Sequence, residues 1–511
     1  MTHASWGCVL GHPSKEVSLP LAQNLCWRTF LESDSERRAI IKQVRIEYGD
    51  STMDIEVPDS AVVTPGENFV EPKPLEDPVE ATRRALAEPL GSPPLRDLVG
   101  PDSKVVIVFP DRVKGGFHVT SHRRVTIPLL VEELTASGVD ERNIKLICAI
   151  GLHRKNRPDE FEAYLGREIV ERFRGERLVN QDPEDPEAIV RLGETDHGDL
   201  VEVNRDVVES DLTIVLGHTM GNPYGGYSGG YKTSTTGLTT WRSIRCHHTP
   251  STLHRADFVP ASSHSHFRGQ LTKIGEKIEE AMKAPFFTVD AVLDRQARQL
   301  GVFAGNTSEV EKAGWSAAAD WMQVGLEGEK ADVLVLGMPR SFHYGPGMGS
   351  NPIIMLQAIG SSIVRNARAL KPGAVVICAS VCDGWFNDKW FPAYREVYEL
   401  FQRCITVDEM EHYADDLCSR SEYIQKFRHA FAYHPFHGLQ LMYMGGIALD
   451  HTRAIYIAGA KAPGFARGMG CIPTSTFEEA IKHAYRYVGE DPKMLVVPAL
   501  SKPQVHLRIG D

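Results

Sequence analysis

The most chemically suggestive stretch of the chain is the glycine-rich run GGYSGGYK at residues 225–232, which ends at Lys232. Sixteen residues after that lysine stands His248, the second of two adjacent histidines. Glycines lack a Cβ, so their backbone can approach an anion such as a phosphate closely. A lysine amine can form a covalent or ionic bond, and an imidazole can bind a metal. The pattern therefore predicts a site for a cofactor that is held by bonds of several kinds.

A second interpretation of the same run is a nucleotide-binding P-loop. That motif needs Gly-x-x-x-x-Gly-Lys followed by Ser or Thr, with the lysine directly after the last glycine. Here Tyr231 stands between Gly230 and Lys232, although Thr233 follows the lysine. A nucleotide- or phosphate-binding protein therefore stays open as an alternative, as does a plain flexible loop with an exposed lysine.

Three further polar clusters follow predicted strands. They are PDRVKGG at residues 110–116, GLHR at residues 151–154 and GHTMGNPY at residues 217–224. The carboxyl ends of parallel strands form the usual ligand edge of an open sheet, so we predict that these clusters share one rim. His153 is suited to proton transfer near neutral pH, and Asp111 to orienting an imidazole. Lys114, Arg112 or Arg154 can pair with a carboxylate.

The elements that must position these clusters are those of an α/β protein. Buried strands are predicted in two sets, at residues 104–109, 144–150 and 211–216, and then at 332–337 and 374–378. Helices are predicted within these sets, over residues 126–137 and 351–370. Such alternation indicates mainly parallel sheets joined by crossover helices.

The length of 511 residues exceeds one ordinary core, so we predict two α/β domains with the active site in the cleft between them. We place an N-terminal extension over residues 1–37 and a cofactor-binding domain over residues 38–290. A second α/β domain, over residues 291–511, is predicted to close the substrate cleft.

Composition limits the classes of function. The formal net charge of −11 argues against a general nucleic-acid binder, because such binding draws on clustered lysine and arginine. No apolar run approaches the roughly 20 residues of a membrane span, and the first residues are unlike a secretory signal. The nine cysteines form no disulfide-like array, which fits a reducing compartment. We expect a cytoplasmic enzyme with a small anionic substrate, and neither nucleic acid nor membrane as a partner.

The residues around the glycine-rich run resemble those of the nickel-dependent lactate racemase superfamily. The resemblance extends from about residue 81 to residue 484 and is strongest over residues 203–248. There the segments VNR, DLTIVLG and GYSGG, with Lys232, Gly237 and His248, keep the order and spacing of the family. The resemblance implies an isomerase, a racemase or epimerase of 2-hydroxy acids.

The resemblance also implies a cofactor, the nickel-pincer nucleotide (nickel pyridinium-3,5-bisthiocarboxylic acid mononucleotide), which cofactor-supply proteins must provide. Lys232 matches the lysine that joins this cofactor covalently through a thioamide, and His248 matches the histidine that binds nickel. Two sulfur donors and one imidazole suit a square-planar nickel site. The cofactor is also expected to contact the glycine-rich run, at Gly226, Ser228, Gly229 and Gly230.

The family reaction removes the C2 hydrogen as a hydride, which avoids a carbanion beside a carboxylate. A histidine takes the hydroxyl proton, and hydride returns to either face of a planar 2-keto acid. His153 matches one of the two family histidines, and Asp111 also matches. Asn222 stands where the family has its second histidine, and an amide cannot exchange a proton near neutral pH. His218 is the predicted substitute, with His247 a weaker candidate.

Three differences from the family pattern concern the substrate. Val113 replaces a threonine, Lys114 replaces an arginine, and Gly360 replaces a lysine three residues after Gln357. An ammonium is a point charge whereas a guanidinium is a bidentate fork, and a glycine is expected to leave room. We therefore predict a 2-hydroxy acid that is larger or more hydroxylated than lactate, such as an aldonate.

The predicted substrate-binding residues are Lys114, Arg154, Asn222, Tyr224 and Gln357. Two further clusters, HY at residues 343–344 and YHPFH at residues 433–437, are predicted to close over the extra substrate atoms. A family member that binds the cofactor but has lost racemisation together with its second histidine stays open as another alternative.

Overall fold

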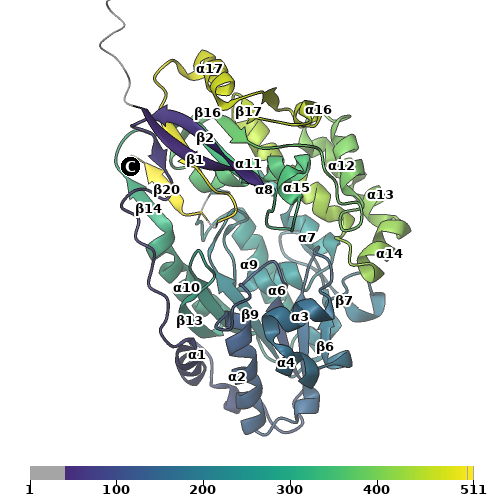
Figure 1. The fold of residues 1–511 in the computed structure, drawn as a ribbon. Coiled ribbons are helices and arrows are strands. Elements are labelled where there is room, and N and C mark those ends of the chain that lie inside the picture. Colours follow the sequence, from purple (N-terminus) through teal and green to yellow (C-terminus); the bar gives the residue numbers. More distant parts are fainter. Residues whose placement is uncertain (1–40, 260, 503, 510–511) are drawn as a thin grey trace, which may run out of the picture.

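The computed structural model describes residues 41–259, 261–502 and 504–509 (Figure 1). The N-terminal extension predicted over residues 1–37 lies outside these described residues. Two sheets of mainly parallel strands, each packed between helices and loops, organise the chain. The predicted α/β class with mainly parallel sheets is confirmed.

The first sheet has six strands in the order β13-β12-β9-β4-β5-β6. These strands are β4 (Val105–Pro110), β5 (Ile144–Ala149), β6 (Leu178–Asn180), β9 (Leu212–Thr219), β12 (Phe287–Leu293) and β13 (Gln299–Asn306). All neighbours are parallel except β12 and β13, which form an antiparallel pair. Three of the strands predicted from the sequence are thus β4, β5 and β9.

Strand β4 illustrates why apolar runs mark this sheet. Its six residues are all buried, as is typical of a parallel strand with both faces covered. Ile107 belongs to an apolar cluster with Leu130 of helix α2 (His122–Ala136), whereas Val108 belongs to a cluster on the other face with Ile274 of helix α9 (His266–Glu280). Alternate side chains therefore fix the strand between two helical layers.

The second sheet has eight strands, with the main order β18-β17-β16-β15-β1-β2 and with β19 and β3 joined to it through β15. These strands are β1 (Ile41–Gly49), β2 (Ser51–Pro58), β3 (Val62–Val63), β15 (Ala331–Pro339), β16 (Leu370–Ala379), β17 (Ile455–Ala458), β18 (Ile472–Thr474) and β19 (Met494–Val497). Only β1 and β2 pair antiparallel. The strands predicted at residues 332–337 and 374–378 are β15 and β16.

The hairpin of β1 and β2 joins the second sheet, although it precedes the first sheet in the sequence. Tyr48 of β1 pairs with Met338 of β15, and Figure 1 shows this purple hairpin beside the green and yellow elements of the second half. At the other boundary, residue 290 falls inside β12 of the first sheet. Sheet membership therefore differs from the predicted domains 38–290 and 291–511 at both boundaries.

Helices of the first half follow or cover the first sheet. They are α1 (Pro78–Ala87), α2 (His122–Ala136), α3 (Pro158–Leu165), α4 (Arg167–Arg172), α5 (Arg205–Glu209), α6 (Tyr231–Gly237), α7 (Trp241–His247), α8 (Pro250–Leu253), α9 (His266–Glu280) and α10 (Thr307–Met322). The second half contributes α11 (Pro352–Asn366), α12 (Tyr394–Phe401), α13 (Ala414–Ser419), α14 (Ser421–His429), α15 (Pro435–His451), α16 (Pro463–Gly468) and α17 (Phe477–Val488).

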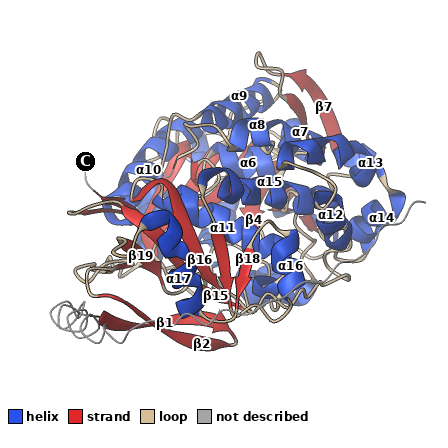
Figure 2. Ribbon diagram, turned by 90° about the horizontal axis from the view of Figure 1, so that it is seen from above, coloured by secondary structure: helices blue, strands red, loops and turns tan. Residues whose placement is uncertain are grey.

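Three small two-stranded sheets complete the fold. They are β7 (Ile189–Glu194) with β8 (Leu200–Asn204), β10 (Gly221–Asn222) with β11 (Gly226–Tyr227), and β14 (Gln323–Leu326) with β20 (His506–Ile509). Helices α11 and α15 pack against each other and lie together in the view from above (Figure 2). One apolar cluster contains Trp241 and Phe267 of the first half together with Ile359 and Phe436 of these helices. The two halves therefore share a continuous core.

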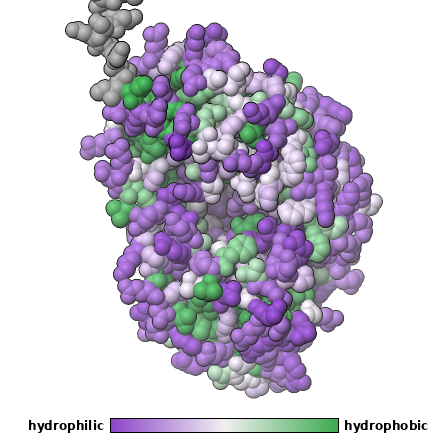
Figure 3. Space-filling model, in the orientation of Figure 1, coloured by the Kyte–Doolittle hydropathy of each residue, from purple (hydrophilic) through white to green (hydrophobic). Residues whose placement is uncertain are grey.

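The face seen in Figure 3 is mostly hydrophilic, with apolar side chains in small groups. In the part of the chain that the structure describes, no helix combines the length and the apolar character needed to cross a membrane.

Candidate active site

A cavity of about 570 Å³ opens beyond the carboxyl ends of β4, β5, β9 and β12. Its first wall holds the predicted clusters, including Asp111, His153 and His218. Its second wall comes from the other half of the chain, through Tyr344 after β15, Gln357 of α11 and His437 of α15, among others. The volume is in the range of about 300–1,000 Å³ that is usual for small-molecule sites. The three strand-end clusters therefore do meet at one rim.

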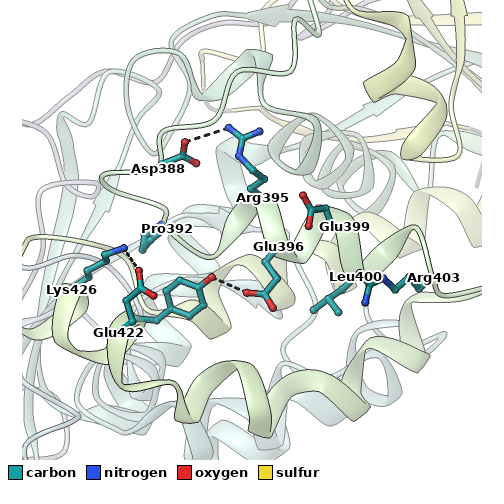
Figure 4. Close-up of a pocket in the computed structure, with 10 residues that line it drawn as sticks. Asp388, Pro392, Arg395, Glu396, Glu399, Leu400, Arg403, Glu422 and Lys426 are labelled. Atoms are coloured by element: carbon teal, nitrogen blue, oxygen red, sulfur yellow. Dashed lines mark hydrogen bonds and ion pairs between the residues drawn. The ribbon is translucent and has the colours of Figure 1, made fainter.

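A second hollow lies on the outer side of α12 and α14 (Figure 4). Its charged side chains mostly satisfy one another: Arg395 pairs with Asp388, and Lys426 pairs with Glu422. Tyr423 donates a hydrogen bond to Glu396, which is also paired with an arginine. This hollow contains none of the predicted site residues.

His153 and Asp111 form a hydrogen-bonded pair at the first wall. The Nδ1 atom of His153 lies 2.7 Å from Oδ2 of Asp111, which is almost fully buried. Burial alone would raise the pKa of Asp111, but the charge of His153 and its hydrogen bond, with Lys114, hold that pKa below its usual value. An ionised Asp111 accepts a hydrogen bond from the N–H group at Nδ1 of His153. Nε2 of His153 is then the nitrogen that can accept a proton. The predicted orientation of an imidazole by Asp111 thus has the required geometry.

The segment that carries Asp111 and Lys114 is fixed from beneath by a buried arginine. Arg123 of α2 donates to the carbonyl oxygens of Pro110, Asp111 and Gly116. Lys114 itself makes no ion pair with any described residue, and burial lowers its pKa. The segment therefore presents a fixed carboxylate and an ammonium that is available to an anion.

The glycine-rich run is fastened by two buried carboxylates. The amide of Gly230 donates to Asp290 at 2.7 Å, and the amide of Tyr231 donates to Glu311 at 2.9 Å. Gly230 has φ 55°, and a Cβ there would lie 2.0 Å from Glu311 Oε1. A Cβ on Gly229, with φ 80°, would lie 2.3 Å from Asp290. These glycines are thus required by close packing against the protein itself.

This fastening bears on the P-loop interpretation. A P-loop binds phosphate through free backbone amides. Here the amides of Ser228, Gly230, Tyr231 and Lys232 all donate to protein oxygens. Of the run, Ser228, Gly229 and Lys232 line the cavity, whereas Gly226 and Gly230 do not. The expected cofactor contacts at Gly226 and Gly230 are therefore not available in this arrangement, because both glycines pack inward.

Lys232 points its amine into the cavity from the first turn of α6. The Nζ atom donates to the carbonyl oxygen of Tyr224 at 2.5 Å and lies 5.0 Å from the ring centre of Phe267. Burial, followed by the charge of Lys114, lowers the pKa of Lys232 well below its usual value. A low pKa makes a neutral and nucleophilic amine accessible near neutral pH. The interpretation as an exposed lysine on a flexible loop is wrong, since only 7% of Lys232 is exposed.

His248 lies at the end of α7 with one ring nitrogen already engaged. Its Nδ1 atom is 2.7 Å from Nδ1 of His247, and the ring of Tyr224 stacks on it with centres 5.4 Å apart. Nε2 of His248 is left for a ligand in the cavity. Metal-binding histidines usually have the other nitrogen held in this way. His247 is fully buried and does not line the cavity, so it does not serve as the substitute acid or base.

Three further imidazoles line the cavity besides His153 and His248. Burial and the charge of Lys114 lower the pKa of His218 to about 3, and burial lowers that of His343 to about 4. The ring of His437 lies 5.4 Å from that of His153, and Tyr394 occupies its Nδ1 atom at 2.7 Å. Burial thus holds all three imidazoles toward the neutral form, since it lowers the pKa of His437 as well. The predicted approach of the clusters at residues 343–344 and 433–437 to the site agrees with this lining.

Helix α11 provides a polar stripe on the second wall. Gln357, Ser361 and Arg365 are spaced four residues apart, and all three line the cavity. Gln357 donates to Ser361 at 2.8 Å. Residues four apart lie on one face of a helix, so this stripe runs along the cavity.

Comparison with known proteins finds relatives of this chain. The chain matches the lactate racemase N-terminal domain over residues 48–258. The lactate racemase of Thermoanaerobacterium thermosaccharolyticum is 22% identical over 427 residues, covering 82% of this chain and 88% of the relative. That of Lactiplantibacillus plantarum is 22% identical over 423 residues, covering 82% and 89%. These matches support a relationship to the lactate racemase superfamily.

Two solved structures agree with this chain in fold. The lactate racemase apoprotein of T. thermosaccharolyticum aligns with TM-score 0.66 and 19% identity, covering 92% of this chain and all (100%) of that one. A Thermotoga maritima protein aligns with TM-score 0.57 and 15% identity, covering 86% and 100%. The comparisons support the predicted resemblance to this superfamily, and the two relatives are named racemases, which are isomerases. The roles of single residues stay predictions.

Two residues that the sequence assigned to substrate binding have structural partners in this protein. Arg154 is buried, forms a two-pronged ion pair with Glu160 and does not line the cavity. Asn222 lines the cavity, but its side-chain oxygen accepts the amide of Tyr224 at 2.8 Å. Arg154 is therefore not part of the proposed site, and Asn222 holds the turn that carries Tyr224.

The expectation that Gly360 leaves room for substrate is wrong. A Cβ at Gly360 would lie 2.2 Å from the carbonyl oxygen of Met444 in α15, and Gly360 does not line the cavity. The glycine instead permits close contact of α11 and α15.

Sequence reasoning missed Arg365, Gln440 and Ser361 as lining residues. The available signal was the four-residue spacing of polar side chains from Gln357 to Arg365 in a mostly apolar helix.

Proposed function

We propose that this protein is a nickel-pincer-nucleotide-dependent racemase or C2-epimerase of a 2-hydroxy acid. The observation that carries the proposal is the convergence of Lys232, His248 and the His153–Asp111 pair on one cavity. When bound, the cofactor would supply nickel, its sulfur donors and an acceptor for hydride. Every other requirement of the reaction falls on side chains of this chain.

The residues present fit such a group. Lys232 offers a buried amine of low pKa for covalent attachment, and His248 offers Nε2 for the metal. Among the described residues, no group of three or more His, Cys, Asp or Glu side chains could hold a metal ion. A metal at His248 would therefore need donors from a bound cofactor, which is what the pincer arms provide.

His153 is the proposed general base for the hydroxyl proton at C2. Asp111 fixes the ring through Nδ1, so that Nε2 can accept a proton from a hydroxyl group and return it. Lys114 would attract the carboxylate of the substrate as a point charge.

His218 is the proposed group for the second face of the substrate, in place of a histidine at position 222. Its pKa of about 3 reflects burial and the positive charge of Lys114. A bound carboxylate would offset that positive charge and raise the pKa of His218 toward a useful range. Hydride transfer with proton exchange at both faces is the mechanism that we infer.

The polar lining supports a substrate more hydroxylated than lactate, such as an aldonate. Uncharged hydrogen-bonding side chains line the second wall, at Gln357, Ser361 and Gln440. Such groups suit the orientation of hydroxyls. The proposed partners are this small acid and the proteins that supply the cofactor, and the unbonded cysteines support a cytoplasmic location.

The test is a panel of chiral 2-hydroxy acids, including lactate and aldonates, incubated in deuterated buffer with cofactor-loaded enzyme. Chiral chromatography measures inversion at C2. Mass spectrometry measures exchange of the C2 hydrogen for deuterium from the buffer. His153→Ala should abolish inversion, because no other described group holds the same place beside Asp111, while the cofactor mass on Lys232 persists. Substantial residual inversion would reject His153 as the base.

A variant of His218 tests whether this histidine serves the second face of the substrate. If His218→Ala inverts substrate at the normal rate in both directions, another group or water serves the second face. A wild-type enzyme that carries nickel but converts substrate only to the keto acid would favour the alternative of lost racemisation.

A further inference from the structure

Arg365 is a charged side chain of the cavity that the proposed reaction does not yet use. It lies in the last turn of α11 and lines the cavity on the same helix face as Gln357 and Ser361. Its Nε atom is buried without a hydrogen-bond partner. No ion pair of its guanidinium occurs with residues 41–259, 261–502 or 504–509.

The three fully buried arginines among the described residues have partners, whereas Arg365 is partly buried. Arg123 donates to three carbonyl oxygens, Arg154 pairs with Glu160, and Arg268 pairs with Glu311. Burial without compensation lowers the pKa of Arg365 to about 10, which still leaves it charged at neutral pH. Partial removal of a charge from water without a counter-ion is costly, so an anionic ligand is the expected counter-ion of Arg365.

The position of Arg365 favours the substrate over the cofactor as that ligand. Lys232 and His248, the proposed cofactor contacts, come from α6 and the end of α7 on the first wall. Arg365 comes from the second wall, on the stripe of Gln357. Its charge acts on His343, which also feels the charges of His153, Lys114 and Asp111. Arg365 therefore shares a region with the acid and base groups.

We propose that Arg365 binds the carboxylate of the 2-hydroxy acid through its bidentate guanidinium and so determines specificity for acids. This inference rests on the proposed function. Arg365 of α11 would then form the two parallel hydrogen bonds to the carboxylate that a lysine cannot form. Lys114 would add a point charge from the opposite wall.

The experiment compares loaded wild-type enzyme with Arg365→Met and Arg365→Lys on D-gluconate, lactate and their uncharged amides. Arg365→Met should raise KM for the acids about 10- to 100-fold, the usual range for losing a hydrogen bond to a charged group. It should leave KM for the amides unchanged, and Arg365→Lys should fall between. The matched control is Arg368→Met, which removes the same charge from an exposed position just after α11.

Two further measurements keep this test separate from that of the proposed function. Nickel content and the mass on Lys232 should be the same in Arg365→Met and wild type. In the full-length apoprotein, D-gluconate should raise Tm for wild type and Arg368→Met but not for Arg365→Met. A Tm shift by inorganic phosphate alone that depends on Arg365 would assign the residue to the cofactor and overturn the inference.

An unchanged KM in Arg365→Met, with equal Tm shifts by D-gluconate in all three proteins, would also overturn it. If wild type inverts no acid at all, the proposed function fails, and the Tm comparison still decides whether Arg365 binds a carboxylate.

Discussion

At the scale of single residues, the site depends on buried side chains whose ionisation is set by their neighbours. Asp111 is held ionised beside His153, whereas Lys232 and His218 are held toward their neutral forms. Residue types and spacing predicted Lys232 with His248, and Asp111 with His153 at a shared rim, and the family resemblance joined the two pairs in one site. The sequence could not reveal that Arg154 is paired with Glu160, since both residue types occur equally in solvated loops.

Asp290 provides a prediction about pH. Burial, opposed by the amide of Gly230 and increased by Glu311, raises the pKa of Asp290 to about 7 from the usual 3.8. Between pH 3.8 and about pH 7, Asp290 keeps its proton in the folded protein but loses it in the unfolded chain. The protonated group therefore favours the folded state at low pH, and this contribution is lost as pH rises toward 7. Through this proton linkage the free energy of unfolding falls by about 4 kcal/mol over the range.

Asp290→Asn mimics the protonated acid and removes this titration. From pH 4.5 to 7.5, the free energy of unfolding of wild type should fall relative to that of Asp290→Asn, by up to about 4 kcal/mol. Urea denaturation at several pH values measures the difference. Parallel pH profiles for the two proteins would show that Asp290 does not hold a proton in the folded state.

At the scale of elements, the carboxyl ends of β4, β5 and β9 bring the polar clusters together, and α11 supplies the opposite wall. Apolar runs predicted these strands because both faces of each are buried. The pairing of β1 with β15 was not predictable, since Tyr48 and Met338 meet across a long sequence separation without a local signal. The inward packing of Gly230 likewise depends on Glu311, which lies on the distant helix α10.

The contact of α11 with α15 gives a prediction about stability. Gly360→Ala places a methyl group 2.2 Å from the Met444 carbonyl oxygen, so the helices must separate. We expect a loss of about 1–3 kcal/mol in the free energy of unfolding, as for other overpacked cores. Thermal and urea denaturation measure it.

Gly269→Ala in α9 is the matched control, because a Cβ there meets nothing within 4 Å. It should leave stability unchanged or raise it by up to about 1 kcal/mol through higher helix propensity. Equal effects of the two substitutions would contradict the proposed close contact at Gly360.

At the scale of the whole molecule, a chain of net charge −11 gathers cations around one cavity. Lys114, Lys232 and Arg365 are among the basic residues that line it, while the acidic residues Asp111 and Asp294 are paired with His153 and Arg298. The surrounding negative charge keeps other polyanions away, and the cavity itself favours a small acid. The net charge predicted that other polyanions are kept away. The preference of the cavity for a small acid depends on the fold.

The central claim is that this cavity holds a nickel nucleotide on Lys232 for the inversion of a hydroxy acid. The most direct measurement is intact and peptide mass spectrometry with metal analysis of protein made together with the cofactor-supply proteins, alongside Lys232→Ala. We predict a covalent mass increase on Lys232 and about one nickel per chain in wild type, both absent in the variant. Unmodified Lys232 and no nickel in wild type would contradict the account.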